Sequence, residues 1–144
     1  MKGLIYRALE VGDAESINRI HAAITNNEEL SDISQHVVEQ ISNAGDISFV
    51  AEIEGRVVGY MISHLIFGGF GIKECAWITM MGVDPEYMGQ GIGLGLAEEI
   101  FKAHKARNVK QIYSSVEWDS TDLLSFFKGL GFERSSFINL KKQL

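Results

Sequence analysis

One segment decides the fold of this chain: Ile78-Thr-Met-Met-Gly-Val83, then Asp84-Pro-Glu-Tyr87, then Met88-Gly-Gln-Gly-Ile-Gly-Leu-Gly95. A helical pattern follows to about Ala106. The four glycines of the turn carry no Cβ, so several backbone N–H groups can approach an anion, and the N-terminus of the following helix adds partial positive charge. The segment therefore predicts a strand, a turn that binds a phosphate or pyrophosphate, and a helix.

Two familiar phosphate loops do not fit this turn. A P-loop needs Gly-Lys-Ser/Thr after the glycines, and none follows here. A dinucleotide fingerprint needs two glycines two apart and a third glycine three residues further on, and no glycines of the turn have that spacing. Another kind of phosphate loop is required.

Two motifs resemble one such family. The run Val83-x-Pro-Glu-Tyr-x-Gly89-Gln-Gly-Ile-Gly93 is similar to the pyrophosphate-binding segment of the GCN5-related N-acetyltransferases, with its pattern Gln/Arg-x-x-Gly-x-Gly/Ala. Downstream, Phe126-Phe127-Lys-Gly-Leu-Gly131-Phe132 resembles that family's Phe/Leu-Tyr-x-x-x-Gly-Phe. The order and the separation of the two motifs also agree with the family, and together they cover most of the chain.

The resemblance implies an α/β fold. The expected sheet is mixed, mostly antiparallel and of six to seven strands, with helices on both faces and a splay between the fourth and fifth strands. It also implies acetyl-CoA as co-substrate. The residues that would bind it are Met81, Gly82, Val83, Met88, Gly89, Gln90, Gly91, Ile92, Gly93, Leu94, Ser120, Leu123, Phe126 and Phe127.

Composition narrows the class of protein. With 144 residues and 46% hydrophobic content, residues 1–144 are expected to form one domain. The net charge of −6, with scattered Lys and Arg, argues against a general nucleic-acid binder. The lone Cys75 and the lack of a signal-like start predict a cytoplasmic protein, and no apolar run reaches membrane-spanning length. No histidines or cysteines have metal-ligand spacing, so no metal site is expected.

Apolar periodicity predicts the secondary structure. Strands are expected over 4–8, 47–53, 56–64, 75–83 and 109–116, with one or two more within 132–140. Helices are expected over 14–25, over Ser34 to Ser42, from the glycine turn to about 106, and from Asp119 or Ser120 to Leu130. The glycine-rich connector 67–74 is read as a hairpin end, with a loop over the acceptor pocket as the alternative.

The end of the strand before the turn is expected to be irregular. Gly82 suggests a β-bulge, and Pro85 must stop the strand because it has no N–H to donate. Backbone groups of residues 81–83 would then be left unpaired. In the resembled family this gap takes the pantetheine arm, and an N–H of Met81 or Gly82 would bind the thioester carbonyl and the oxyanion that develops from it.

Several positions depart from the family pattern. Met88 stands where the family has Gln or Arg, so phosphate binding should rest on the backbone and the helix dipole. Ser120 aligns with an Asn that often touches the coenzyme, and capping of the next helix explains it equally well. Phe127 stands where many members have a Tyr that protonates the leaving thiolate. A water, the ammonium intermediate, or another hydroxyl such as that of Ser120 or Tyr113 could supply the proton instead, or the protein could bind acyl-CoA without turning it over. A thiolate with an ordinary pKa of about 8.5 does not require that proton at neutral pH.

The general base is the other open position. The family's Glu on the strand falls on Trp77, which cannot accept a proton. By alternation Thr79 shares the face of Trp77 and Met81, and it could hold a water that relays the proton of the amine. Glu117, Asp119 and Glu74 are further candidates, and solvated surface charge also explains each of them.

The sequence thus predicts an acyl-CoA-dependent N-acyltransferase, an enzyme that transfers the acetyl group of acetyl-CoA to a primary amine by direct attack. The alternative is a non-catalytic acyl-CoA-binding module that regulates a partner. The acceptor stays open among polyamines, amino acids, antibiotics, peptide N-termini and protein lysines. The oligomeric state is open too, although dimers are common in the resembled family.

Overall fold

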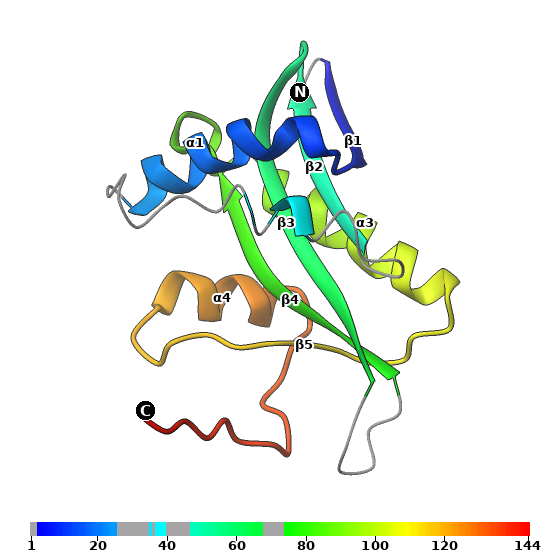
Figure 1. Cartoon of the computed structure of the whole chain (residues 1–144), viewed down its shortest axis with the longest axis vertical. Helices are drawn as coiled ribbons and strands as arrows, with labels where there is room; N and C mark the ends of the chain where they lie inside the picture. Colours follow the sequence, from blue (N-terminus) through cyan, green and yellow to red (C-terminus); the bar gives the residue numbers. More distant parts are fainter. Residues whose placement is uncertain (1–2, 26–34, 36, 40–46, 68–73) are drawn as a thin grey trace.

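Among the residues that the structure describes, five strands form one sheet in the order β1-β2-β3-β4-β5. Figure 1 shows the arrangement of these strands in the computed structural model. The structure describes residues 3–25, 35, 37–39, 47–67 and 74–144. Neighbouring strands from β1 to β4 are antiparallel, whereas β5 runs parallel to β4. The strands are β1 (Leu4–Ala8), β2 (Ile47–Ile53), β3 (Arg56–Phe67), β4 (Glu74–Val83) and β5 (Ile112–Ser114).

Helices cover both faces of this sheet, as expected. The α-helices are α1 (Ala14–Thr25), α3 (Ile92–Ala106) and α4 (Thr121–Gly129), and short 3-10 turns occupy Val11–Asp13 and Pro85–Tyr87. Figure 1 shows α1 and α3 on opposite faces of the central strands. Because a sheet presents alternate residues to its two faces, two hydrophobic clusters result, one under each helix.

The apolar spacing of the helices determines which side they bury. In α1, Ile17 and Ile20 are fully buried beside Tyr60 and Ile62 of β3. One stripe of α3, at helical spacing, packs with Met61 of β3 and Phe127 of α4 in the larger cluster. The residues of this stripe are Ile92, Leu96, Ala97 and Ile100. The mixed α/β architecture and the helix over 92–106 agree with the sequence-based expectation.

The bulge in β4 lies at Thr79, not at Gly82. Gly82 pairs in register with Tyr60, whereas the consecutive β3 residues Ile62 and Ser63 face Met80 and Ile78, so Thr79 is the extra residue. Gly82 has a packing reason instead, because a Cβ there would lie 2.8 Å from the Tyr60 ring. The prediction of a bulge was right, but its position was wrong.

The extra residue also reverses the alternation along β4. Ile78 belongs to the α3-side cluster and Met81 packs against the same cluster, although a regular strand would place them on opposite faces. Trp77 and Met81 therefore lie on opposite faces of the sheet. The expectation that Thr79 shares one face with both of them was wrong, because it assumed unbroken alternation.

The C-terminal segment corrects the expected strand count. Residues 132–140 form no strand, and β5 is shorter than the expected 109–116, so the described residues contribute five strands rather than six or seven. In this segment, side chains form hydrogen bonds in place of the backbone ladder of a strand. Ser135 Oγ bonds to the backbone of Phe137, and the Asn139 side chain donates to Ser115 Oγ. The connector 68–73 and most of the helix expected over Ser34 to Ser42 lie outside the described residues, although Gln35 and 37–39 are helical.

An ion-pair network fastens β1 to β2 and to the start of α1. The Arg7 guanidinium donates to both carboxylate oxygens of Asp13 at 2.8 Å and to Glu52 at 2.7 Å. Burial by itself would raise the pKa of Asp13, but hydrogen bonds from Arg7 and from the Glu10 N–H, together with the charge of Arg7, lower it below the usual value. Asp13 is thus held as a carboxylate in the fold.

Candidate functional site

The turn after β4 is anchored by a buried carboxylate. Asp84 is 6% exposed, and its side chain accepts the Glu86 N–H at 3.0 Å while its own N–H donates to the Val58 carbonyl at 2.8 Å. Arg19 of α1 and Arg56 of β3 approach the same carboxylate at 3.3 and 3.6 Å. The residues that follow are therefore presented from a fixed point on the sheet.

Gly91 is the N-cap residue of α3, and its backbone has a conformation that favours glycine. Its φ is 81° and its ψ is 9°, the left-handed region, and a Cβ at this position would meet nothing within 4 Å. Gly89 shares the positive φ and the open surroundings. Among the described residues, the space on the Cβ side of these two glycines is therefore open.

The first turn of α3 offers backbone donors. No side chain caps this helix within the described part of the chain, and its first intrahelical acceptor, the Gly91 carbonyl, takes the Gly95 N–H at 3.0 Å. The N–H groups of Ile92, Gly93 and Leu94 consequently have no acceptor inside the helix. With the helix dipole behind them, these donors suit a phosphate group.

Three of the expected coenzyme-binding elements meet at Gly93. A Cβ on this residue would lie 3.2 Å from the ring of Phe126 in α4 and 3.9 Å from Cε of Met81 in β4. The turn, the end of β4 and the start of α4 thus converge on one place.

The fourth glycine of the turn is explained by close packing and not by the approach of an anion. Gly95 lies under the side chain of Tyr6 on β1, whose hydroxyl would be 1.9 Å from a Cβ at this position. Burial, and then the nearby charges of Glu98 and Glu99, raise the pKa of Tyr6. Sequence reasoning missed this contact, because nothing in the local pattern indicates that β1 reaches α3.

β4 and β5 separate next to this place. They pair only at Ala76, Trp77 and Ile78, and Ser114 Oγ donates to the Ile78 carbonyl at 3.0 Å, whereas β4 continues to Val83. This is the expected splay between the fourth and fifth strands. The second half of β4 is held by β3 on one side and has no pairing with β5 on the other.

The bulge determines which amides face the gap. The Asp84 N–H points to β3, where it donates to Val58, so alternation directs the Gly82 N–H to β3 and those of Met81 and Val83 away from it. The Ile78 carbonyl also points away from β3, toward Ser114. Of the two candidate donors from sequence, the geometry therefore favours Met81.

The candidate acid and base residues differ in how exposed they are. Thr79 is exposed at the bulge, with its hydroxyl 3.5 Å from the Ile62 carbonyl, and Glu117 is exposed in the connection from β5 to α4. Ser120 is the N-cap residue of α4, without a side-chain capping bond. Phe127 is 7% exposed and packs between Phe126 and Phe132, with ring centroids 5.3 and 5.0 Å away.

A buried tyrosine of β3, which pairs with Gly82 of β4, was not predicted from the sequence. Tyr60 is 1% exposed, its hydroxyl lies 3.4 Å from Nδ1 of His21, and burial raises its pKa to about 12. Its ring fills the space that Gly82 leaves. Alternation on a β-rich strand could have placed Tyr60 in the core, but only the register shows that it faces Gly82.

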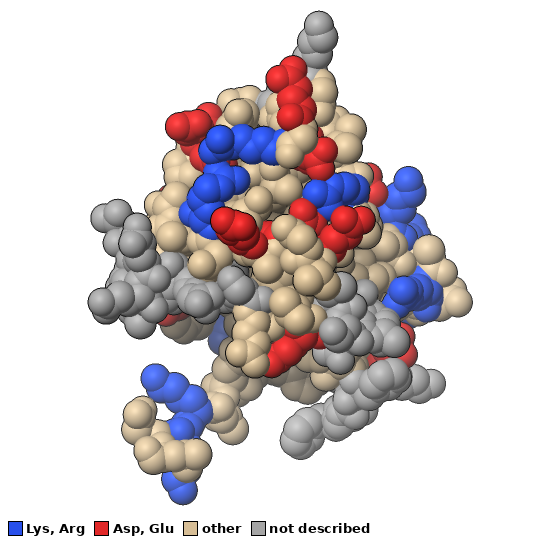
Figure 2. All heavy atoms as spheres, turned by 45° about the horizontal axis from the view of Figure 1, so that its top comes forward, with Lys and Arg blue, Asp and Glu red and all other residues tan. Residues whose placement is uncertain are grey.

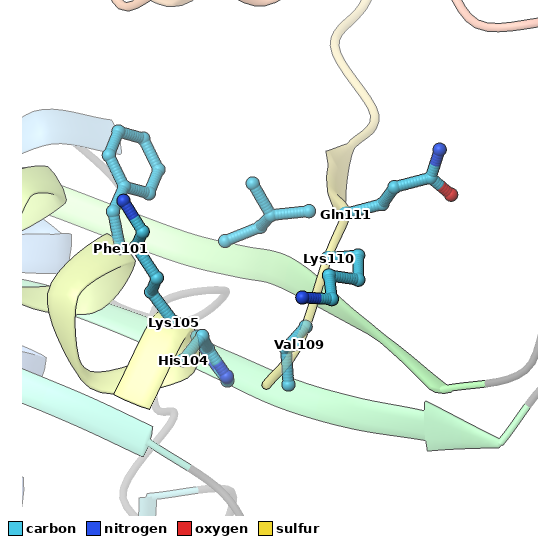
Figure 3. A pocket seen from close by; sticks show the side chains of 7 residues that line it. Phe101, His104, Lys105, Val109, Lys110 and Gln111 are labelled. Carbon is cyan, nitrogen blue, oxygen red and sulfur yellow. The ribbon is translucent and has the colours of Figure 1, made fainter. Parts of the chain in front are cut away.

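A separate hollow lies at the far end of α3. Figure 3 shows Phe101, His104 and Lys105 from the helix on one side and the segment leading to β5 on the other. The volume between them is about 280 Å³. His104 is 3% exposed, and its Nε2 lies 2.8 Å from Ser63 Oγ. This hollow is at the C-terminal end of α3, whereas the glycine turn is at its N-terminus.

The charge distribution also bears on possible ligands. On the upper part of the face in Figure 2, acidic and basic side chains are interspersed, whereas the segment at the lower left carries basic side chains. Among the described residues, no three His, Cys, Asp or Glu are grouped as a metal site would require. Within the same residues, the helices are too short or too polar to cross a membrane.

Comparison with known proteins shows the family of this chain. The sequence pattern of the acetyltransferase (GNAT) family matches residues 14–132. The chain belongs to the GNAT family. Within this GNAT chain, the matched range includes the glycine turn, the gap beside β4 and α4.

A relative and two solved structures are similar to this GNAT chain. An N-alpha-acetyltransferase of Sulfurisphaera tokodaii is 29% identical over 103 residues, which are 67% of this chain and 62% of that protein. The match thus spans less than two thirds of the relative. An aminoglycoside acetyltransferase from an uncultured soil metagenomic sample, solved with sisomicin, has a TM-score of 0.82 at 19% identity, covering 99% of this chain and 97% of its own.

The second structure is aminoglycoside N-acetyltransferase AAC(6')-Iy in complex with CoA. Its TM-score is 0.83 at 12% identity, and the match covers 97% of this chain and 94% of that one. Likeness at such low identities shows the fold.

Proposed function

We propose that this GNAT chain is an N-acetyltransferase that moves the acetyl group of acetyl-CoA to a primary amine by direct attack. The observation that carries the proposal is the gap beside β4, where the amides of Met81 and Val83 face away from β3 next to the open turn at Gly91. Family membership supports the same reaction.

The coenzyme would use both features. Its pyrophosphate would accept hydrogen bonds from the N–H groups at the start of α3, and its pantetheine arm would lie beside β4 in place of a fifth-strand partner. The Phe126 ring and the Met81 side chain, which meet at Gly93, would border the arm.

In the reaction, the nitrogen of the neutral amine forms a bond to the acyl carbon, and the amine gives up one proton. The bond from the acyl carbon to sulfur breaks, so that CoA leaves as a thiolate. The Met81 N–H would stabilise the oxyanion, and one such donor lowers the barrier by about 2.7–4 kcal/mol. Thr79, exposed at the bulge, would hold the water that accepts the proton, with Glu117 as the alternative base.

A paired measurement tests the coenzyme site. Gly91→Asn adds a side chain at the front of the turn, and asparagine tolerates a positive φ. Gly131→Asn is the matched control, because Gly131 also has a positive φ and nothing within 4 Å of a Cβ. We expect calorimetry to show affinity for acetyl-CoA about tenfold weaker in the first variant and unchanged in the second. Equal affinities would refute the proposed site.

Thiol release tests the transfer itself. Protein and acetyl-CoA are mixed with a peptide carrying a free α-amine, a lysine peptide, a polyamine and an aminoglycoside, and free thiol is followed by a colorimetric reagent. The first and last acceptors correspond to the names of the relative and of the solved structures. Release that depends on one of the amines supports the proposal. Tight binding of acetyl-CoA without release over any amine would instead select the regulatory binding module.

A further inference from the structure

Aromatic side chains form a row across the sheet just before β4 and β5 separate. Trp77 of β4 pairs in register with His64 of β3 on one side and with Tyr113 of β5 on the other. The rings of Trp77 and Tyr113 stack, with centroids 5.3 Å apart and planes at 21°. Phe137 of the C-terminal segment approaches Tyr113 edge-on, with centroids 6.4 Å apart.

The row faces away from α3. Ile78 and Ile112 contribute to the cluster under α3, and each is next to a member of the aromatic pair, so alternation directs Trp77 and Tyr113 to the opposite face. Both rings are only partly buried, and Phe137 is 44% exposed. Core packing under α3 therefore does not account for them.

The row also borders the gap. Trp77 and Tyr113 pair one step before Ile78 and Ser114, the last pair of the two strands. The turn that would bind the coenzyme's pyrophosphate belongs to α3, on the other side of the sheet. A second substrate that reaches the acyl group from the opposite face would consequently pass beside these rings.

We infer that Trp77 and Tyr113 form a platform for the acceptor, and that the acceptor is a primary amine with an aromatic ring a few bonds from the nitrogen. This inference rests on the proposed function. At most about 14 Å of strand separates Trp77 from Met81, so an acceptor whose ring lies on the platform can extend its amine along β4 toward the acyl carbon.

The chemistry of the platform favours an aromatic partner. Stacked and edge-to-face aromatic pairs contribute beyond the area they bury, and the half-buried rings leave surface for one more ring. The Tyr113 ring is held by stacking on Trp77 and by the edge contact with Phe137, and its hydroxyl donates to Gln111 Oε1 at 3.0 Å. A flat ring is thus offered a surface that is already ordered.

Fluorescence gives a readout that does not depend on turnover. The chain has two tryptophans, and Trp118→Phe removes the one that is 84% exposed, so that emission reports on Trp77. In this background, saturated with CoA, 2-phenylethylamine and n-hexylamine are titrated. We expect 2-phenylethylamine to change the emission and to bind about 2- to 12-fold more tightly than n-hexylamine.

Variants assign the effect to the platform. Tyr113→Leu should remove the preference for 2-phenylethylamine, whereas Tyr113→Phe, which keeps the ring and loses only the bond to Gln111, should retain it. In otherwise unaltered protein, calorimetry should show that Trp77→Leu removes the same preference and leaves the affinity for CoA unchanged. Equal binding of the two amines, or a preference that survives both leucine variants, would overturn the inference.

The two proposals fail in different ways. If 2-phenylethylamine binds preferentially but no amine releases thiol, the platform stands and the transferase proposal falls. If thiol is released with several amines but without preference for the aromatic one, the transferase stands and the platform falls.

Discussion

Ser114 Oγ donates a hydrogen bond to the Ile78 carbonyl oxygen at 3.0 Å, within the last residue pair that joins β4 to β5. From that bond onward, β4 has a partner on only one side. The next amides that point away from β3 are those of Met81 and Val83, and the bulge at Thr79 gives them that direction.

Hydrogen exchange should detect this difference. In the protein alone, the amides of Met81 and Val83 are expected to exchange faster than that of Gly82, which faces β3. Saturation with CoA should slow exchange at Met81 and Val83 and leave Gly82 unchanged, because the pantetheine arm would occupy the open side. Amide-resolved NMR measures all three positions, and protection that appears at Gly82 alone would contradict the orientation.

The contact of Gly95 with Tyr6 predicts a stability defect. Gly95→Ala puts a methyl group where the Tyr6 hydroxyl and ring lie, and such overpacking costs about 1–3 kcal/mol of unfolding free energy. Combining it with Tyr6→Leu should recover part of the loss. Gly129→Ala in α4 is the control, because its Cβ would meet nothing within 4 Å. Urea unfolding of the four proteins checks this, and equal effects of the two alanines would be evidence against the contact.

The adjacent residues Phe126 and Phe127 should respond differently to truncation. Phe127→Ala is expected to lower the unfolding free energy by about 3–5 kcal/mol, because its ring is in the core. Phe126→Ala should be milder in stability but should weaken acetyl-CoA binding by about fivefold, because its ring lies beside Gly93 and Met81. Leu124→Ala, at a residue 39% exposed on the same helix, is the control for binding.

Acid should weaken the fold through Asp13. Its pKa in the folded protein is lowered, so the unfolded chain takes up the proton first as the pH falls. The stabilisation is complete above the ordinary carboxylate pKa and is lost as the pH drops through the lower folded value. Asp13→Asn should cost about 1.5–3 kcal/mol at neutral pH, because it replaces a charge-assisted pair with Arg7, and should flatten this part of the pH profile. An unfolding series from pH 2 to pH 7 checks it, and parallel profiles would contradict the assignment.

Local sequence patterns predicted the parts of this protein that local physics determines. The strand, the turn with Pro85 and Gly91, and the helix to Ala106 follow from apolar period, a missing N–H and a positive φ, all of which act within a few residues. The separation of β4 from β5 was expected from family resemblance together with Pro85, and the pairing register bears it out.

Long-range contacts account for what was missed. Gly82 looked like a bulge because a glycine weakens a strand, but the reason for it is the Tyr60 ring on the neighbouring strand. The actual bulge at Thr79 has no glycine to indicate it, and it upset every assignment of faces made by counting from Trp77. The strands expected within 132–140 did not form either, because an apolar alternation by itself does not determine whether a segment pairs with the sheet.

The pairing of Asp84 with Arg19 and Arg56 connects α1 and β3 to the start of the glycine turn. Arg19 comes from the helix on the face opposite α3, while the aspartate begins the turn that leads to α3. A shift of α1 would therefore act on the residue from which the glycine turn starts, as well as on the strands against which the helix packs.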